Sequence, residues 1–247
     1  MNTFYLIGST IAKSLSPAMH NAAFAALSLP YAYTCKELPE TTDIAAIISS
    51  FTVEQVPGFN ITMPFKESVI PYIPFGDDAV RAIGSINTAV FNGSGYTGYN
   101  TDWSGFLASL KNDYCTIPTD KHCVVLGAGG AARAIVYALK TVGAKVTIAN
   151  RTIGKAQIVA HEFGVGATSL DEGRIFHDAD LVINCTPADL SNMVKPDGCY
   201  YDCNYLRSDT GKSMLVWQGA HAFELWTGRS APVAQMKEVV YGNVRQR

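Results

Sequence analysis

The sequence predicts an α/β fold in two domains, and three observations support this prediction. Short apolar runs typical of strands alternate along the chain with segments of helical apolar spacing. A polar stretch at 114–121, which contains proline and shows no apolar period, separates two such series. The second series opens at residue 122 with a strand, a glycine-rich turn and a helix. We therefore divide the chain near residues 103 and 115, with a bridging helix between the domains.

Individual elements follow from the same patterns. In the first series, apolar or alternating runs predict strands at 4–8, 31–38, 58–62, 86–91 and 96–99, the last two as a hairpin around 92–95. Helical spacing predicts helices at 17–27, 42–51, 64–72 and 101–112. In the second series we expect strands at 122–126, 145–149 and 180–185, and later two helices between 214 and 244, interrupted at 228–232.

The composition argues against several classes of protein. With 247 residues, of which 48% are hydrophobic, the chain can bury a substantial core. The net charge of −2 gives no electrostatic reason to expect a nucleic-acid partner. The sequence has neither an apolar run of about 18 residues nor the basic start of a signal peptide, so we expect a cytoplasmic protein. The six cysteines form no CxxC pair and no zinc set with histidine, so no metal is expected.

The glycine-rich turn after the strand at 122–126 indicates a dinucleotide site. Gly127 permits the tight turn, Gly129 lets the backbone approach a pyrophosphate, and Ala132 takes the small third position of the fingerprint. The start of the following helix offers free N–H groups and a positive dipole end to phosphate. The alternative is a glycine-rich turn in an α/β protein that binds no nucleotide.

The end of the next predicted strand distinguishes between two cofactors. An NAD-binding fold usually carries an acidic residue there, which accepts a hydrogen bond from the ribose 2′-hydroxyl. This chain has Asn150, Arg151 and Thr152 instead, with Lys155 one turn further. A guanidinium binds a 2′-phosphate through paired N–H donors, whereas a carboxylate would repel it. The pattern favours NADP; the alternative is that Arg151 and Thr152 only open a helix.

Polar residues of the first domain suit a small polar substrate. Ser16 before Pro17 is typical of a helix start, with serine as the N-cap, but Ser14 has no such explanation. Two hydroxyl groups at a helix N-terminus suit a carboxylate. Asn60 and Thr62 end a predicted strand and point to one face.

A lysine and an aspartate in this domain are candidate catalytic groups. Lys66 falls in the first turn of the helix predicted at 64–72, where a cation is unfavourable for stability, and this indicates general acid/base chemistry. Asp102 begins the bridging helix, where a negative charge is stabilising, and it is also a candidate carboxylate partner for Lys66. The alternative for Lys66 is a solvated surface lysine.

Seven segments, in this order, make the sequence resemble the shikimate dehydrogenase family: SLSPAMHN, GFNITMPFKESVIPY, AIGSINT, GYNTDWSGF, GAGGAARA, NRT and MLVWQGAHAFELWTG. The resemblance covers nearly the whole chain. It implies NADP-dependent, reversible reduction of 3-dehydroshikimate to shikimate, on the route through chorismate to aromatic amino acids. It further implies a substrate-binding catalytic domain over 1–103 plus about 218–247, to which the C-terminal helix returns, and a Rossmann-like NADP-binding domain over 104–217. The protein is expected to be a monomer or a homodimer.

The resemblance also implies a role for each site residue. Those toward the substrate are the carboxylate-binding Ser14 and Ser16, the hydroxyl-binding Thr62, Asn87, Asp102 and Gln218, with Asn60 nearby, the weaker match Tyr205, and the catalytic pair Lys66 and Asp102. Those toward the cofactor are the pyrophosphate-binding Gly127, Ala128, Gly129, Gly130 and Ala131, the 2′-phosphate-binding Asn150, Arg151 and Thr152 with Lys155, and the weaker matches Asp78, Cys203 and Gly211.

One segment departs from the family pattern. Family members usually carry an additional helix between the tyrosine that matches Tyr205 and the MLVWQG segment, whereas residues 206–213 here are too few for one. This shortening weakens the assignments of Tyr205 and Gly211. Three alternatives remain: a quinate/shikimate dehydrogenase that uses NAD, a non-catalytic sensor of a metabolite or dinucleotide on the same scaffold, and a Rossmann dehydrogenase of another small acid.

Overall fold

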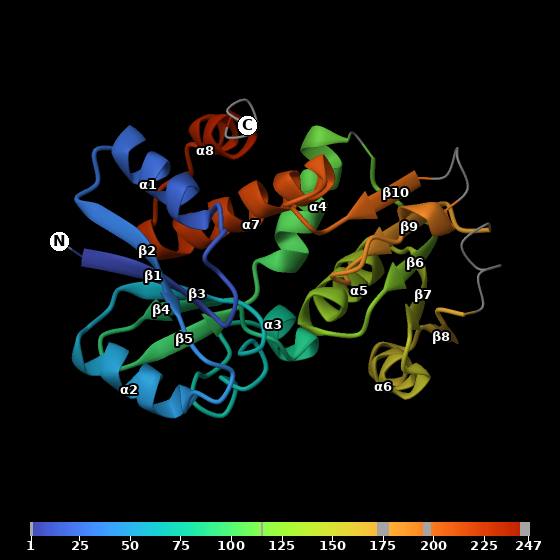
Figure 1. Ribbon diagram of the computed structural model, residues 1–247, viewed down its shortest axis with the longest axis horizontal. Helices are drawn as coiled ribbons and strands as arrows, with labels where there is room; N and C mark the ends of the chain where they lie inside the picture. Colours follow the sequence, from blue (N-terminus) through green and yellow to red (C-terminus); the bar gives the residue numbers. More distant parts are fainter. Residues whose placement is uncertain (1, 115, 172–177, 195–198, 243–247) are drawn as a thin grey trace. The chain divides into compact units, whose positions relative to one another are not determined.

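The computed structural model describes residues 2–114, 116–171, 178–194 and 199–242 (Figure 1). The chain forms two compact units, the first made of Met1–Thr101 with Leu215–Arg247 and the second of Asp102–Met214. Both boundaries lie a few residues before those predicted at 103 and 217. Each unit contains one five-stranded sheet with helices packed on it, so the predicted α/β class is confirmed.

The sheet of the first unit is mixed and has the order β2-β1-β3-β4-β5. Its parallel part consists of β1 (Asn2–Gly8), β2 (Tyr31–Glu37) and β3 (Gly58–Ile61). The predicted hairpin forms β4 (Thr88–Phe91) and β5 (Tyr96–Tyr99), which run antiparallel to each other and add to the edge of β3. The carboxyl end of β3 therefore lies next to the start of β4.

Helices cover both faces of this sheet. Figure 1 shows α1 (Ser16–Ala26) and α8 (Val233–Gly242) on one side and α2 (Ile44–Val53) on the other. Consecutive residues of β1 point to these two faces, as the strand period requires. The Phe4 ring lies 4.8 Å from Trp226 of α7 (Asp209–Thr227), whereas Tyr5 stacks on Phe51 of α2 at 5.1 Å.

The helix predicted at 64–72 is not formed. Residues 63–72 make consecutive turns instead, with bonds such as Phe65 N–H to the Thr62 carbonyl and Val69 N–H to the Phe65 carbonyl. Phe65, Val69 and Ile73 are buried at intervals of four, and this apolar spacing imitates a helix in the sequence. The helix-dipole argument for Lys66 therefore does not apply, since Lys66 lies in a turn.

One helix of the first unit was not predicted. The helix α3 spans Asp78–Ile83. Its N-cap is Asp77, whose side chain accepts a hydrogen bond from Val80 N–H at 2.8 Å, and it ends at Gly84 with φ of 65°. Aspartate before a short apolar run and glycine after it are the usual helix boundary signals. The helix is too short to show an apolar period.

The sheet of the second unit is parallel throughout, with the order β10-β9-β6-β7-β8. The predicted strands form β6 (His122–Leu126), β7 (Lys145–Asn150) and β9 (Leu181–Asn184), whereas the edge strands β8 (Gly166–Ser169) and β10 (Cys199–Asp202) were not predicted. Counted along the unit, the spatial order is 3-2-1-4-5, the Rossmann order. Its topological switch point lies between β6 and β9, where such folds bind ligands outside the carboxyl ends of the strands.

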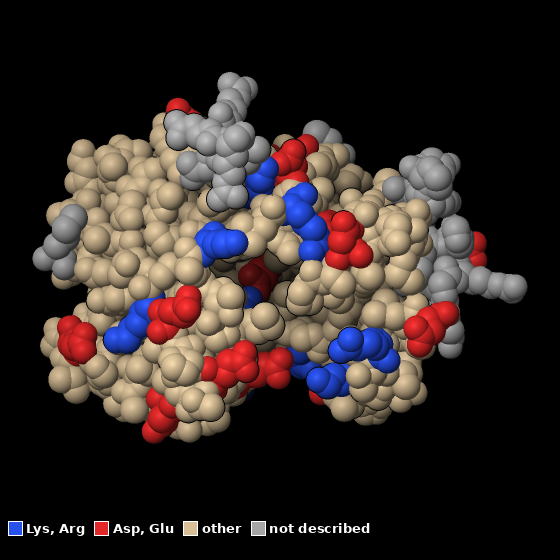
Figure 2. Space-filling model, viewed as in Figure 1, with Lys and Arg blue, Asp and Glu red and all other residues tan. Residues whose placement is uncertain are grey.

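Three helices cover one face of this sheet. α4 (Asp102–Asp113), α5 (Gly130–Thr141) and α6 (Ile153–Phe163) share one hydrophobic core with Cys123 and Val125 of β6. The other face packs on irregular segments and a short 3-10 helix, η2 (Ser191–Met193). None of the helices described is both long and apolar enough to cross a membrane. Figure 2 shows acidic and basic side chains mixed in small groups over the described part of the face drawn.

Candidate active site

Asn60 is held by three side-chain hydrogen bonds at the end of β3. Its Oδ1 accepts from the Tyr33 hydroxyl at 2.8 Å, and its Nδ2 donates to the Asn87 carbonyl at 3.1 Å and to the Thr88 hydroxyl at 3.0 Å. Burial raises the pKa of Tyr33 well above its usual value, so its hydroxyl keeps its proton and remains a donor. The orientation of the Asn60 amide is therefore fixed by three partners.

Asn87 continues this network on the neighbouring loop. Its Oδ1 accepts from Thr101 N–H at 2.8 Å and from the Thr88 hydroxyl at 2.9 Å, while its Nδ2 donates to the Thr101 hydroxyl at 3.0 Å. The Thr101 hydroxyl also lies 3.4 Å from Oε1 of Gln218, on the part of α7 that belongs to the same unit. Gln218 thus joins the network although it is distant in sequence.

The network brings together three of the predicted substrate residues, Asn60, Asn87 and Gln218, and adds three that were not predicted. Tyr33, Thr88 and Thr101 could not be found in the sequence, because tyrosine and threonine are common in strands and loops and only the folded sheet brings their hydroxyl groups together. Buried neutral donors and acceptors of fixed direction are what selective recognition of hydroxyl groups requires.

The two serines of the first loop have different local roles from those expected. The helix α1 begins at Ser16, and the residue in the N-cap position is Leu15, which makes no side-chain cap. The prediction that Ser16 is the N-cap is therefore wrong. Instead, Oγ of Ser14 accepts from Ser16 N–H at 3.2 Å. Ser16 is buried and Ser14 half-buried, and carboxylate binding by either stays a prediction.

Lys66 belongs to the first unit, whereas Asp102 is the first residue of the second unit. Lys66 is half-buried in the turn segment, and its carbonyl accepts from Ile86 N–H at 2.9 Å. Asp102 is buried and is the first residue of α4, directly after Thr101 of the polar network. Thr62 is half-buried and lies shortly before Lys66 in the chain, and its methyl group occupies the place that a Cβ on Gly8 would take. The catalytic pairing of Lys66 with Asp102 stays a prediction.

The glycine-rich turn of the second unit has the geometry of a phosphate cradle. Gly127 has φ of 110°, a conformation that L side chains rarely adopt, and its N–H donates to the Ala149 carbonyl at 2.8 Å. Gly129 is the N-cap of α5, and a Cβ placed on it would meet nothing within 4 Å. The turn is therefore open on the side of Gly129, next to the first N–H groups of α5.

The residues expected to select the 2′-phosphate lie at the neighbouring strand end. β6 and β7 are paired with Leu126 opposite Ala149, so the glycine turn and Asn150 follow at the same edge of the sheet. The Asn150 amide donates to the Thr152 carbonyl at 2.9 Å and shapes this turn. Arg151, Thr152 and Lys155 are exposed, and all lie within the first residues of α6 or just before it.

Four residues match the family pattern more weakly: Asp78, Cys203, Tyr205 and Gly211. Cys203 and Tyr205 are half-buried in the loop after β10. Gly211 is buried against the backbone of Asn204 and Tyr205, at 2.5 Å from the place of a Cβ, so local packing alone requires glycine there. Asp78 is fully exposed at the start of α3, 3.9 Å from Arg81. The described residues hold no group of three metal-binding side chains. The roles of these matches toward the cofactor stay predictions.

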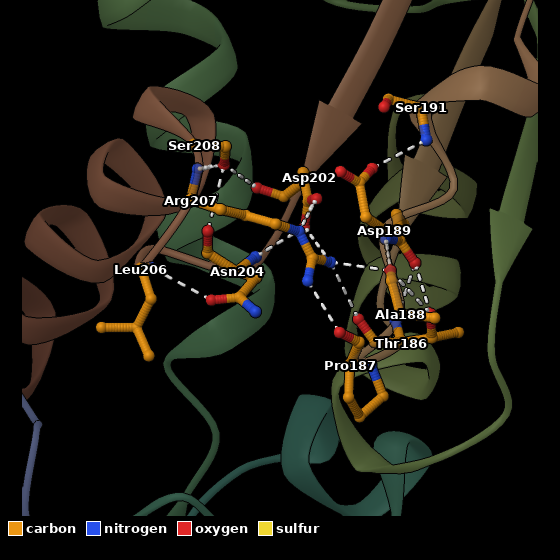
Figure 3. A network of polar contacts seen from close by, with 12 residues as sticks. Thr186, Pro187, Ala188, Asp189, Ser191, Asp202, Asn204, Leu206, Arg207 and Ser208 are labelled. Carbon is orange, nitrogen blue, oxygen red and sulfur yellow. Dashed lines mark hydrogen bonds and ion pairs between the residues drawn. The ribbon is translucent and has the colours of Figure 1, made fainter.

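An arginine that was not predicted joins two loops of the second unit (Figure 3). Arg207 Nε donates to Asp202 at 2.6 Å, and its terminal nitrogens donate to the carbonyls of Pro187 and Ala188 at 2.7 and 2.8 Å. The Asp202 side chain is 4% exposed, so this ion pair is largely shielded from water. Arg207 lies in the shortened segment, and it ties the loop after β10 to the loop after β9.

A Rossmann-type unit with an open glycine turn, together with a second α/β unit that carries a buried polar network, defines a class of nucleotide-dependent oxidoreductases. Family models match the chain as shikimate dehydrogenase substrate binding domain over residues 6–89, shikimate / quinate 5-dehydrogenase over 111–196 and shikimate 5′-dehydrogenase C-terminal domain over 211–241. The chain belongs to the shikimate dehydrogenase family.

Individual relatives agree with this assignment. Proteins named shikimate dehydrogenase (NADP(+)) from Carboxydothermus hydrogenoformans and Methanopyrus kandleri are each 37% identical to this chain. The alignment with the first covers 95% of this chain and 95% of the relative. The alignment with the second covers 99% of this chain and 96% of the relative. The solved shikimate 5-dehydrogenase of Thermus thermophilus, in complex with NADP(H) and shikimate, is 32% identical with a TM-score of 0.87 over 98% of this chain and 99% of its own. The first alignment spans 273 residues, more than the 247 of this chain, so that relative carries segments that are missing here.

Proposed function

We propose that this protein reduces the ring ketone of 3-dehydroshikimate to the alcohol of shikimate, reversibly and with NADPH, in the route to chorismate. The relatives' names and the ligands of the Thermus complex support both substrate and cofactor. The observation that carries the proposal is the buried network of Asn60, Asn87 and Gln218, because it presents fixed neutral groups of the kind that distinguish hydroxyls on a ring.

The second unit fits a dinucleotide phosphate. The open space beside Gly129 leaves room for a pyrophosphate at the N-terminus of α5, where backbone N–H groups and the helix dipole favour anions. The exposed Arg151 follows the neighbouring strand and suits a 2′-phosphate. When bound, the nicotinamide supplies the hydride.

The chain's own residues do the remaining chemistry. In the proposed mechanism Lys66 gives a proton from its ammonium to the oxygen that develops negative charge, and in reverse neutral Lys66 takes the hydroxyl proton. Asp102 orients Lys66 and accepts from a neighbouring hydroxyl. Ser14 and Ser16 hold the carboxylate of the substrate, while Thr62, Asn87 and Gln218 hold the ring hydroxyls.

The test is absorbance at the reduced-cofactor band with shikimate plus NADP. The expected result is reduction of NADP, with much lower kcat/KM for quinate in place of shikimate and for NAD in place of NADP. Higher kcat/KM with quinate and NAD would favour the alternative quinate/shikimate dehydrogenase. Shikimate binding by calorimetry without any turnover would favour the sensor.

Lys66→Ala tests the proton-transfer role. We expect kcat to fall by about 10²–10⁴-fold, the range for loss of a general acid, with KM nearly unchanged. Lys111→Ala, an exposed lysine on α4, is the matched control and should keep kcat. A Lys66→Ala enzyme with near-normal kcat would remove Lys66 from the chemistry.

We also propose a cytoplasmic location and a monomeric or homodimeric state. Both are predictions from the sequence, and the second is tested by light scattering of the purified protein. A larger assembly would contradict it.

A further inference from the structure

Two cysteines lie side by side at the carboxyl ends of β9 and β10 in the second sheet. Cys185 directly follows β9 and Cys203 directly follows β10, and these strands are paired with Asn184 opposite Asp202. Cys203 N–H still donates to the Asn184 carbonyl at 2.9 Å, so the pairing extends to the cysteines. Their Sγ atoms are 3.7 Å apart, and both residues are partly exposed.

The backbone spacing at this point suits a disulfide. Neighbouring strands lie about 4.8 Å apart, within the range of about 4.4–6.8 Å that Cα atoms span across a disulfide. Since an S–S bond is about 2.05 Å long, the sulfurs of Cys185 and Cys203 must approach by well over an ångström. We expect rotation of the two side chains to supply part of this movement and the loops to supply the rest.

The Arg207 clamp keeps these two loops together (Figure 3). It binds the Asp202 carboxylate, directly before Cys203, at 2.6 and 3.2 Å, and two carbonyls that follow Cys185 in the chain. A two-pronged guanidinium–carboxylate pair is among the stronger and more directional contacts in proteins. The thiols are thus held close by a contact that does not involve sulfur.

Cys185 also lies close to the glycine-rich turn at Gly127. A Cβ built on Gly127 would stand 3.2 Å from Cγ2 of Thr186 and 3.5 Å from the carbonyl carbon and oxygen of Cys185. Cys185 N–H also donates to the carbonyl of Leu126, the residue directly before Gly127, at 2.9 Å, so the backbone at 185 is bonded to the start of the turn. A movement of Cys185 by an ångström therefore displaces the turn or opens a gap behind it.

We propose that Cys185 and Cys203 are a reversible disulfide site, which reacts with low-molecular-weight disulfides and weakens NADP binding when it closes. This rests on the proposed function, in which NADP binds at the glycine turn. Relatives with other residues at these two positions would lack the response.

The reaction is thiol–disulfide exchange. One cysteine thiolate attacks a sulfur of oxidised glutathione, which forms a mixed disulfide and releases one glutathione thiolate that takes up a proton. The second cysteine then attacks the protein-side sulfur and releases the second glutathione. The two cysteines are oxidised, the reagent's S–S bond is reduced to two thiols, and the cysteine protons end on glutathione. The contact with Cys185, with burial in addition, raises the pKa of the Cys203 thiol, so the exchange should be faster at alkaline pH.

The test compares the full-length protein after incubation with oxidised glutathione and after reduction with dithiothreitol. Intact mass should show the loss of two hydrogens, and peptide mapping should find Cys185 joined to Cys203. The Kd for NADPH, measured by fluorescence, should rise about tenfold on oxidation, which corresponds to about 1.4 kcal/mol of binding free energy. Adding dithiothreitol should restore it.

Two variants make the test specific, each compared only with itself in the two redox states. Cys185→Ser should show the same Kd before and after oxidation, whereas Cys199→Ser, which removes an exposed cysteine at the start of β10, should respond like the unmodified chain. If peptide mapping finds glutathione on Cys199 and no disulfide between Cys185 and Cys203, the proposed disulfide site is wrong. If mapping finds the Cys185–Cys203 disulfide but the Kd for NADPH is unchanged, the proposed effect on NADP binding is wrong. Failure of the proposed function is distinguished by the reduced protein, which would then neither bind NADPH nor oxidise shikimate.

Discussion

The polar network of the first unit and the glycine-rich turn of the second unit, which we propose bind the substrate and NADP, are built in opposite ways. At the first, Asn60 and Asn87 are buried side chains whose directions are set by several hydrogen bonds. At the second, the open turn at Gly129 and the exposed Arg151 offer backbone N–H groups and a cation. Recognition in the first unit is therefore tied to stability, whereas in the second unit affinity can change with little effect on folding.

Among the variants that test this comparison, Asn87→Ala is expected to have the largest effect on stability. The change removes the acceptor of the Thr101 N–H at 2.8 Å and one acceptor of the Thr88 hydroxyl, and we expect a loss of about 3 kcal/mol in the free energy of unfolding. Urea denaturation measures this. Asn112→Ala, an exposed asparagine on α4, should stay within about 0.5 kcal/mol. A loss below about 1 kcal/mol for Asn87→Ala would mean that the network does not stabilise the unit.

The pH dependence of unfolding also tests how far buried groups of the first unit determine its stability. Burial lowers the pKa of His20 to about 3, whereas it is near 6.5 in the unfolded chain, so protonation favours unfolding. This contribution is fully present above pH 6.5 and is lost progressively as the pH falls toward 3. Between about pH 6.5 and about pH 5 the loss should be about 2 kcal/mol. His20→Phe should remove this part of the pH dependence in urea denaturation, and equal slopes for the two proteins would contradict it.

The next prediction concerns the exposed Arg151 of the second unit. Arg151→Ala should raise KM for NADP about tenfold, which corresponds to about 1.4 kcal/mol, because a charge-assisted contact with phosphate is lost. KM for NAD and the free energy of unfolding should hardly change. Lys121→Ala, another exposed cation of the second unit, is the control for net charge. An equal rise of KM for both cofactors would show that Arg151 does not read the 2′-phosphate.

The smallest expected effect is that of Tyr33→Phe, which removes only the hydroxyl bonded to Asn60. We expect a loss of about 1 kcal/mol in the free energy of unfolding and a higher KM for shikimate. Tyr31→Phe on the same strand is the matched control, since its ring also packs on aromatic neighbours. Equal values for the two variants would separate Tyr33 from the site.

Much of the fold could be predicted because local signals and tertiary packing agree. The hairpin at β4 and β5 and the unit from β6 to β7 follow alternation and glycine placement. The turn segment around Lys66 was predicted wrongly, because burial of Phe65, Val69 and Ile73 satisfies a helical spacing without a helix. The edge strand β10 is four residues long, and its pairing with β9 comes from the sheet rather than from its own sequence.

The candidate site was predictable in part. Asn60, Asn87 and Gln218 follow from the family resemblance, and the structure joins them through hydrogen bonds. Tyr33 and Arg207 could not be predicted, because their roles depend on partners brought together by the sheets. A hydroxyl or a guanidinium has a positioning role only once its acceptor is known.

The division of the chain has a consequence for its synthesis. The second unit is continuous from Asp102 to Met214, so it can form as soon as those residues have left the ribosome. The first unit starts at the N-terminus, but the Phe4 ring packs on Trp226, whose indole N–H donates to the Ala89 carbonyl at 3.0 Å. The unit whose N-terminal part is translated first is thus completed last, because its core needs residues that follow the whole second unit in the chain.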